Sequence, residues 1–309
     1  MTNQTAAATA HSPSDVRTGV LAAVAAYTMW GLLPIYLIAL RGVGPDEVLV
    51  QRILWSVPFG AMIITARTQW LDVRLALSNR KILLPLAGSS CIIALNWLIY
   101  IGAVQSQQIF EASLGYYINP LIYVLVGVVF LGETLSNLQK GAVALAMVGV
   151  SVLTLYGGSF PLIAMVLALS FTGYGYLRKM TPVGAMPGLF IETLFLAPVA
   201  FLYLMIFGTA GESAFGTEVG ITLMLIAAGP ITVMPLLMFA IGARRLPLST
   251  LGFLQFIGPT LQFIIGLIDG EPFTRAHQFC FTAIWIAAAL FAGDAILRQR
   301  AERLAAKAA

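Results

Sequence analysis

EASLGYYINPLIYVLVGVVFLGE (residues 111–133) and STLGFLQFIGPTLQFIIGLIDGE (residues 249–271) have the same order of features. Each contains Leu-Gly, an aromatic residue, a proline several residues later, an apolar run and a closing Gly-Glu. Each is apolar enough to lie in lipid, yet each carries polar side chains. The two stretches therefore predict that a membrane-embedded segment occurs twice in the chain.

The composition extends this prediction to the whole chain. Of 309 residues, 59% are hydrophobic and only 10% are charged, whereas soluble domains carry about 25% charged residues. A membrane-spanning helix needs about 20 apolar residues. Uncharged windows lie at 18–40, 82–110, 112–132, 141–177, 219–243 and 246–268, and weaker apolar segments lie at 47–66, 187–207 and 276–294. Since YGGSFP (156–161) divides the longest window, we expect an all-α polytopic membrane protein with ten transmembrane helices.

The positive charges predict how these helices thread the membrane. Of the 17 Lys and Arg residues, 14 fall in one alternating set of loops and tails, and two, Arg41 and Arg275, fall in the other set. Cytoplasmic loops are enriched in Lys and Arg, so both termini should be cytoplasmic in a bacterial inner membrane. We expect residues 1–17 to form a disordered tail and 296–309 a basic tail. The net charge of +4 follows from this loop bias and does not indicate nucleic-acid binding.

The duplication can be followed along the chain. Landmarks at a separation of 138 to 140 residues are Pro58 and Pro198, IGA at 101–103 and 241–243, Pro120 and Pro259, and Glu133 and Glu271. These pairs predict two repeats of five helices, residues 18–158 and 159–295. Because five is odd, the second repeat must enter the membrane from the opposite side. Such inverted repeats are typical of secondary transporters, whose substrate site lies near the midplane between the repeats.

Several motifs also resemble a known family. They are AAYTMWGLLPIY (25–36), DEVLVQRILWS (46–56), NWLIYIGAV (96–104), EASLGYYINPL (111–121) and RLPLSTLGFLQFIGPTL (245–261). Together they are similar to RarD-like members of the EamA-type branch of the drug/metabolite transporter superfamily. The resemblance implies ten helices in two inverted five-helix repeats around a central cavity. Such proteins are often labelled chloramphenicol-sensitivity proteins, and their natural substrates are largely unassigned.

Polar and aromatic residues recur at helical spacing within the expected spans. The candidate substrate-binding residues are Tyr27, Trp30, Asn96, Tyr100, Tyr116, Asn119, Tyr174, Gln255 and Gln262. If they line one cavity, that cavity suits an amphipathic small molecule, aromatic or cationic. The alternative is that Trp and Tyr form interfacial belts while Asn and Gln hold helices together.

Charges within the expected spans form a second set of candidates. Charged side chains inside a membrane are costly and usually mark pathways or pairs. We expect an outer gate in which Arg52 meets Glu111, and an inner gate in which Glu192 meets Arg245. The alternative is that these side chains extend to lipid headgroups. Glu133 and Glu271 end their segments and are expected to satisfy free N–H groups of the following helix.

The remaining motifs do not favour an enzyme. The histidines are His11 and His277, and no HExxH, GxSxG or P-loop motif occurs. We expect no metal site and no cofactor, and we expect Cys91 and Cys280 to be packing residues. The sequence predicts a secondary transporter that moves a small organic solute by alternating access, as a monomer or homodimer. Protons are candidate coupling ions through Glu111 or Glu192, and a lipid-intermediate flippase or a non-transporting binding or scaffold protein are the alternatives.

Overall fold

The computed structural model describes residues 13–131, 135–157, 160–208, 213–246, 250–251 and 254–308, and within them the chain is helical with no strand. The helices are α1 (Pro13–Ala39), α2 (Pro45–Ala66), α3 (Trp70–Leu77), α4 (Arg80–Gln105), α5 (Ile109–Leu131), α6 (Asn137–Gly157), α7 (Leu162–Met180), α8 (Ala185–Tyr203), α9 (Val219–Ala243), α11 (Ile257–Ile268) and α12 (Arg275–Ala308). A π-helical turn, η1 (Leu204–Gly208), continues α8. As predicted, the long uncharged window is divided, because α6 ends at Gly157 and α7 begins at Leu162.

Seven helices of the described part are long and apolar enough to cross a membrane. They cover Asp15–Ala39, Pro45–Ala66, Arg80–Gln105, Asn137–Gly157, Ala185–Phe207, Val219–Ala243 and Arg275–Asp294. Shorter apolar helices cover Leu162–Arg178 and Ile257–Ile268. The chain is therefore an all-helical, multi-pass membrane protein, and the count of ten spans stays a prediction.

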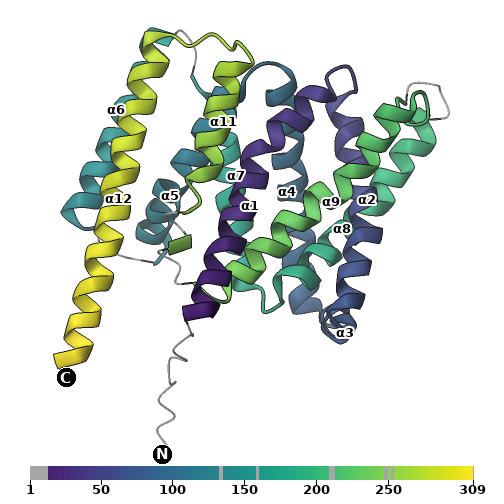
Figure 1. Cartoon of the computed structure of the whole chain (residues 1–309), viewed down its shortest axis with the longest axis horizontal. Coiled ribbons are helices and arrows are strands. Elements are labelled where there is room, and N and C mark those ends of the chain that lie inside the picture. The colour runs from purple at the N-terminus through teal and green to yellow at the C-terminus, as the bar shows by residue number, and fades with distance from the viewer. Residues whose placement is uncertain are drawn as a thin grey trace, which may run out of the picture.

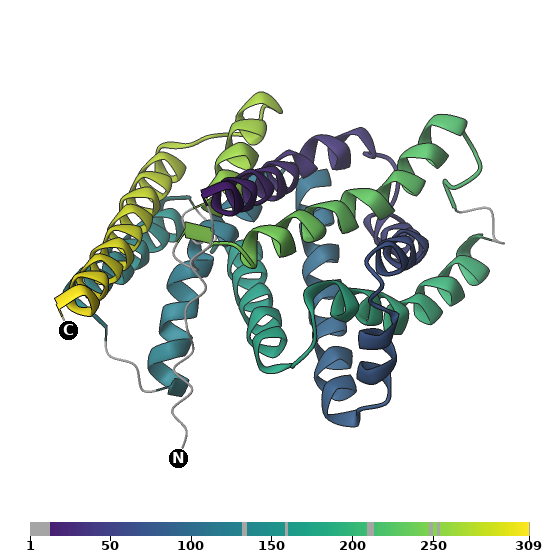
Figure 2. The ribbon, with the colours of Figure 1, turned by 60° about the horizontal axis from the view of Figure 1, so that its bottom comes forward.

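The helices lie side by side with the α6–α12 pair at one end and α2, α8 and α9 at the other (Figure 1, Figure 2). Contacts made by the first half recur in the second. Helix α1 packs on α9 as α4 packs on α7, and α1 packs on α11 as α5 packs on α7. Contacts between counterparts are α2 with α8, α5 with α11, and α6 with α12. This is the packing expected when α1–α6 and α7–α12 are related halves.

Glycines allow two helix contacts, α2 with α9 and α5 with α7, to be very close. A methyl group at Gly229 of α9 would lie 2.5 Å from the carbonyl oxygen of Trp55 in α2. At Gly115 of α5 it would lie 2.8 Å from the carbonyl oxygen of Ala164 in α7. Both distances are below van der Waals contact, so only hydrogen fits. Small residues at such positions let membrane helices approach and gain dispersion energy.

Helix α3 was not predicted from the sequence, which placed residues 67–81 in a positively charged loop. Its side chains Val73 and Ala76 are buried, whereas Leu71 and Leu75 are more than 60% exposed. Trp70 packs edge-on against Phe190 of α8, with ring centroids 5.7 Å apart. A short helix with this apolar, partly exposed surface beside basic residues suits the membrane interface.

The expected ninth span differs from the prediction at its start. Gln255 lies in a turn and α11 begins at Ile257, so Gln255 and Gln262 do not share one continuous helix. Pro259 explains the break, because its ring would clash with the carbonyl group of residue 255 in a continuous helix. The proline instead occupies the first turn of α11, where no N–H group is needed.

Candidate functional site

The first polar centre is built around Arg52 in α2. Arg52 lies seven residues after Pro45, the start of the helix, which corresponds to a depth of about 10 Å. Its side chain is only 6% exposed. Its Nε donates to Thr232 Oγ1 of α9 at 2.7 Å, and the guanidinium carbon lies 4.4 Å from the ring centroid of Trp97 in α4. Three helices therefore fix the orientation of this cation.

Aromatic side chains lead away from this centre along α4, α5 and α7. Ring centroids are 5.7 Å apart for Tyr100 and Tyr116, and 5.8 Å apart for Tyr116 and Phe171. Phe171 and Tyr174 follow at 6.2 Å. Tyr100 and Tyr116 lie within electrostatic reach of the Arg52 guanidinium. Three of the predicted binding residues, Tyr100, Tyr116 and Tyr174, thus belong to one aromatic row.

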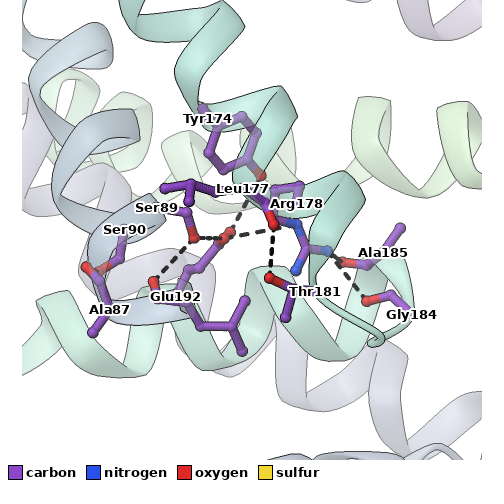
Figure 3. Close-up of polar contacts among 11 residues, drawn as sticks. Ala87, Ser89, Ser90, Tyr174, Leu177, Arg178, Thr181, Gly184, Ala185 and Glu192 are labelled. Carbon is purple, nitrogen blue, oxygen red and sulfur yellow. Dashed lines mark hydrogen bonds and ion pairs between the residues drawn. The ribbon is translucent and has the colours of Figure 1, made fainter. Parts of the chain in front are cut away.

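The second polar centre lies at the far end of this row, around Glu192 of α8 (Figure 3). Glu192 is 1% exposed. Ser89 Oγ of α4 donates to its Oε1 at 2.5 Å, and Tyr174 Oη of α7 donates to its Oε2 at 3.2 Å. Arg178 Nε lies 3.7 Å from Oε1. The carboxylate is therefore surrounded by donors from two other helices.

The start of α8 holds Arg178 beside this carboxylate. Its Nη2 donates to the carbonyl oxygens of Gly184 and Ala185, each at 3.3 Å (Figure 3). The guanidinium lies over Gly188, where any Cβ would overlap it. The ion pair between α7 and α8 thus depends on a glycine one turn before Glu192.

Neither predicted gate pair is formed in this conformation, among the residues that the structure describes. Arg52 contacts Thr232 and Trp97, and within the described residues it forms no ion pair. Glu111 instead accepts a hydrogen bond from the backbone N–H of Ile163 at 3.2 Å, because α5 packs against the start of α7, where free N–H groups favour a carboxylate.

The inner pair is likewise not formed in this conformation. Arg245 lies in the turn just after α9, and its Nη1 donates to the carbonyl oxygen of Ile241 in the last turn of α9 at 3.1 Å. Glu192 pairs with Arg178, which lies on the adjacent helix α7. Ser89 and Thr232 were missed by the sequence analysis, since a hydroxyl in an apolar helix carries no signal of its partner.

Other predicted binding residues form a separate cluster where α1, α9 and α11 meet. Ring centroids of Tyr27 and Trp30 are 5.7 Å apart, and Trp30 and Phe239 are 5.8 Å apart. Gln262 Nε2 of α11 donates to the carbonyl oxygen of Trp30 at 3.3 Å. Under the predicted repeat these three helices would correspond to α7, α4 and α5, the helices that carry Tyr174, Tyr100 and Tyr116 of the aromatic row.

The amides at the helix contacts are only partly satisfied. Asn96 Nδ2 donates to the carbonyl oxygen of Leu167 at 3.1 Å and to Ser170 Oγ at 2.9 Å. Within the described chain, the side-chain oxygens of Asn96, Asn119 and Gln262 are buried without a hydrogen-bond partner. The sequence-based expectation that all nine candidates, Gln255 included, line a single cavity stays a prediction.

Contacts at the upper edge of Figure 1 join the two halves. Arg41, in the α1–α2 loop, forms an ion pair with Asp269 after α11. Glu271 accepts from the backbone N–H of Ile109 at 2.7 Å and of Phe110 at 3.1 Å. It therefore satisfies the start of α5 and not, as predicted, that of the following helix. Its counterpart Glu133 lies outside the described residues.

The carboxyl group of Glu271 binds its proton more tightly than an exposed one. Burial is the main cause, and it raises the pKa of Glu271 to about 7. The hydrogen bonds from Phe110 and Ile109 oppose this shift, whereas the neighbouring Asp269 and Glu111 add to it. Glu271 lies between α11 and α12, outside both helices. The carboxyl group is thus poised to change its charge near neutral pH.

Comparison with known proteins gives a consistent result. The sequence model of the EamA-like transporter family matches residues 17–155. Protein RarD of Salmonella typhi is 43% identical over 288 residues, which cover 93% of this chain and 98% of the relative. An uncharacterized transporter of Vibrio cholerae serotype O1 is 42% identical over 293 residues, with coverage of 94% and 97%. A solved structure described only as the crystal structure of a protein has a TM-score of 0.60 at 20% identity and covers 89% of this chain and 97% of its own, which supports the fold alone.

Proposed function

This chain belongs to the RarD group of the EamA-like transporter family, and from that premise we propose that it moves a small organic solute across the bacterial inner membrane by alternating access between two inverted halves. Each half consists of five membrane helices, with boundaries at 18–158 and 159–295. The family and its relatives make the chain a membrane transporter and not an enzyme. Alternating access requires that two bodies rock about a shared site.

The paired helix contacts are the observation that carries this proposal. Helix α1 holds α9 and α11 in the way that α7 holds α4 and α5. Buried opposite charges, Arg52 and Glu192, lie at positions 140 residues apart on the counterpart helices α2 and α8. Each is seven residues from the start of its helix, so an inversion would place the two at equal depths from opposite surfaces. Two related bodies with polar centres between them are what the mechanism needs.

The upper-edge contacts suggest which end is closed in this conformation. The Arg41–Asp269 ion pair and the Glu271 hydrogen bonds both join the first half to the second. Under the proposed mechanism these contacts break when the pathway opens at that end.

A reversible cross-link tests this mechanism. Arg41→Cys and Asp269→Cys are introduced together in a background without Cys91 and Cys280, and the protein is reconstituted into liposomes. Flux is measured for a panel of radiolabelled amino acids, amines, organic acids, nucleosides and antibiotics. Joining the two cysteines with a short bis-maleimide should stop flux, whereas a disulfide should stop it until a reductant is added.

The controls distinguish the rival functions. Each single-cysteine variant treated with the same reagent should transport normally. Unchanged flux in a fully cross-linked protein contradicts opening at this end. Absence of flux for every solute, with lipid scrambling in the same liposomes, favours the lipid-intermediate flippase, and absence of both favours a binding or scaffold protein. Collapse of a proton gradient during flux would identify protons as the coupling ion, and cross-linking between subunits would separate a homodimer from a monomer.

A further inference from the structure

Arg52 and Glu192 differ in how their charges are balanced. Glu192 has Arg178 as an ionic partner. Arg52 is equally enclosed, yet its partners are the neutral Thr232 hydroxyl and the face of Trp97. Within the described residues no carboxylate forms an ion pair with it. One of the two related charges is therefore balanced inside the protein, and the other is not.

An unbalanced guanidinium at this depth is unfavourable. Arginine keeps its proton in proteins, so the group cannot avoid the cost by becoming neutral. A buried charge without a counter-ion loses its hydration and regains little in return. The Trp97 ring and the Thr232 hydroxyl offset part of this loss. A ligand that brings an anionic group would supply the missing interaction.

The contacts of Arg52 also indicate the shape of that group. Its Nε is occupied by Thr232 and its face lies on Trp97, so the edge that carries Nη1 and Nη2 is left, and neither atom has a hydrogen-bond acceptor among the described residues. Two parallel N–H groups on one edge match the two oxygens of a carboxylate. A single cation balances a monoanion better than a dianionic phosphate.

Neighbouring side chains supply further donors and an apolar wall. The hydroxyl of Tyr100 is buried without a hydrogen-bond partner in the described part of the chain. The Tyr116 ring lies beside Tyr100, and both tyrosines are within electrostatic reach of Arg52. A phenolic O–H group can donate to a carboxylate oxygen, and the rings can pack against an apolar body.

We propose that Arg52 binds the carboxylate of the transported solute, so that the solute is a small organic monocarboxylate with an apolar or aromatic body. This inference rests on the proposed transport function and specifies the charge of its substrate. It keeps the amphipathic, aromatic solute expected from the sequence and excludes the cationic alternative. Trp97, Tyr100 and Tyr116 then recognise the part of the solute next to its carboxylate.

A matched pair of probes tests this assignment on the purified full-length protein in detergent. Thermal unfolding is followed with 3-phenylpropionate and with its uncharged analogue 3-phenylpropionamide, at constant ionic strength. The carboxylate should raise the unfolding temperature with a saturable dependence on concentration, and the amide should not. Sodium chloride and sodium phosphate at the same concentrations should also give no saturable shift.

Variants identify the residue. Arg52→Gln should abolish the shift, and its ligand-free unfolding temperature should equal or exceed that of the wild type because an unbalanced charge is gone. Arg74→Gln is the control, since Arg74 is an exposed residue of α3, and it should keep the carboxylate shift. Arg52→Lys keeps the charge but loses the paired donors, so it should weaken binding of 3-phenylpropionate at least tenfold.

Several outcomes would overturn the assignment. They are an equal shift with the amide, a saturable shift with chloride or phosphate, or undiminished binding of 3-phenylpropionate to Arg52→Gln or Arg52→Lys. The liposome assay separates this failure from failure of the transport proposal. Flux of neutral or cationic solutes that persists in Arg52→Gln would contradict the carboxylate site and leave transport intact. Carboxylate binding without any flux would retain the site and contradict transport.

Discussion

Each buried charge of the polar centres is held by a hydroxyl from a different helix. Thr232 Oγ1 accepts from Arg52 and donates to the carbonyl oxygen of Ala228 at 2.8 Å, so both of its functions are used. Ser89 has the corresponding role beside Glu192. Hydroxyl groups can bond either to their own helix or across a contact. This choice depends on the neighbouring helix, which explains why the sequence alone did not identify either residue.

The Arg178–Glu192 pair predicts a non-additive pattern of stability. Arg178→Gln leaves Glu192 buried without its cation, and the free energy of unfolding should fall by about 3–5 kcal/mol. Adding Glu192→Gln should recover most of the loss, because no unpaired charge remains. Thermal and denaturant unfolding in detergent measure both effects. Arg245→Gln is the control and should change little, since the Arg245 side chain bonds only to the nearby carbonyl oxygen of Ile241 at the end of α9 among the contacts described. Additive losses in the double variant would contradict a coupled pair.

The raised pKa of Glu271 predicts a pH effect of defined sign. Since folding raises its pKa to about 7 from an ordinary value of 4.5, the folded protein binds this proton more tightly than the unfolded chain. Its contribution to stability is therefore complete below about pH 4.5 and declines as the pH rises through about 7. Glu271→Gln keeps an acceptor for Ile109 and Phe110 but carries no charge. Relative to the wild type, this variant should gain stability between pH 5 and pH 8.

Unfolding temperatures measured across this pH range test the effect. Glu218→Gln is the matched control, because Glu218 also lies at the start of a helix, α9, but is exposed. The difference in unfolding temperature between the wild type and Glu218→Gln should not show the change between pH 5 and pH 8 that is expected for Glu271→Gln. A constant difference between wild type and Glu271→Gln from pH 5 to pH 8 would contradict the assignment.

At the scale of elements, the pattern of charged residues predicted most helices, but it did not predict where helices break near a proline. The uncharged windows located α1, α4, α6 and α9, and the Gly-Gly break between α6 and α7 was confirmed. Prolines at repeated positions behave differently, because α5 continues through Pro120 whereas α11 begins just before Pro259. In a membrane, a helix can either continue through a proline or break at it, provided that neighbouring groups satisfy the carbonyl oxygen that loses its hydrogen bond. The local sequence contains no information about those neighbours.

The candidate site was predicted to a lesser degree than the fold. Asn96 and Tyr100 lie one turn apart in α4, as their spacing predicts, and both are buried. It could not show that Tyr27 and Tyr100 lie in different clusters, since that depends on how α1 and α4 pack. The gate residues have other partners in this conformation for the same reason, because depth in the membrane does not specify which helix lies opposite.

Close helix packing predicts an effect of one added methyl group. Gly229→Ala would place a carbon 2.5 Å from the Trp55 carbonyl oxygen, so α2 and α9 must separate. Overpacking of this kind costs about 1–3 kcal/mol, and the Arg52–Thr232 hydrogen bond between the same helices should weaken. Gly220→Ala, also in α9, has open space around it and should be neutral. Equal unfolding temperatures for the two variants would contradict the close approach of α2 and α9.

At the scale of the whole molecule, the helix ends divide into two edges. The described start of α1, the C-terminal end of α12 and helix α3 lie at the lower edge of Figure 1, while the α1–α2 loop and the start of α12 lie at the upper edge. The Lys and Arg residues concentrate in the loops and tails of the lower edge. Because such residues are retained in the cytoplasm, the lower edge is predicted to be cytoplasmic, with both termini on that side.

Single cysteines at the two edges test this orientation. Ser106, which follows α4, and Thr217, which precedes α9, are exposed residues of upper-edge loops, and Ser78, which follows α3, is an exposed residue of the lower edge. Each is changed to cysteine in a background without Cys91 and Cys280. In intact cells an impermeant maleimide should label positions 106 and 217 but not position 78, whereas all three should react after lysis. We expect this labelling pattern because the opposite orientation would require 14 of the 17 basic side chains to be transferred across the membrane, whereas Lys and Arg are normally retained in the cytoplasm. Labelling of position 78 alone in intact cells would reverse the orientation, and it would then place the Arg41–Asp269 contact at the cytoplasmic end of the pathway.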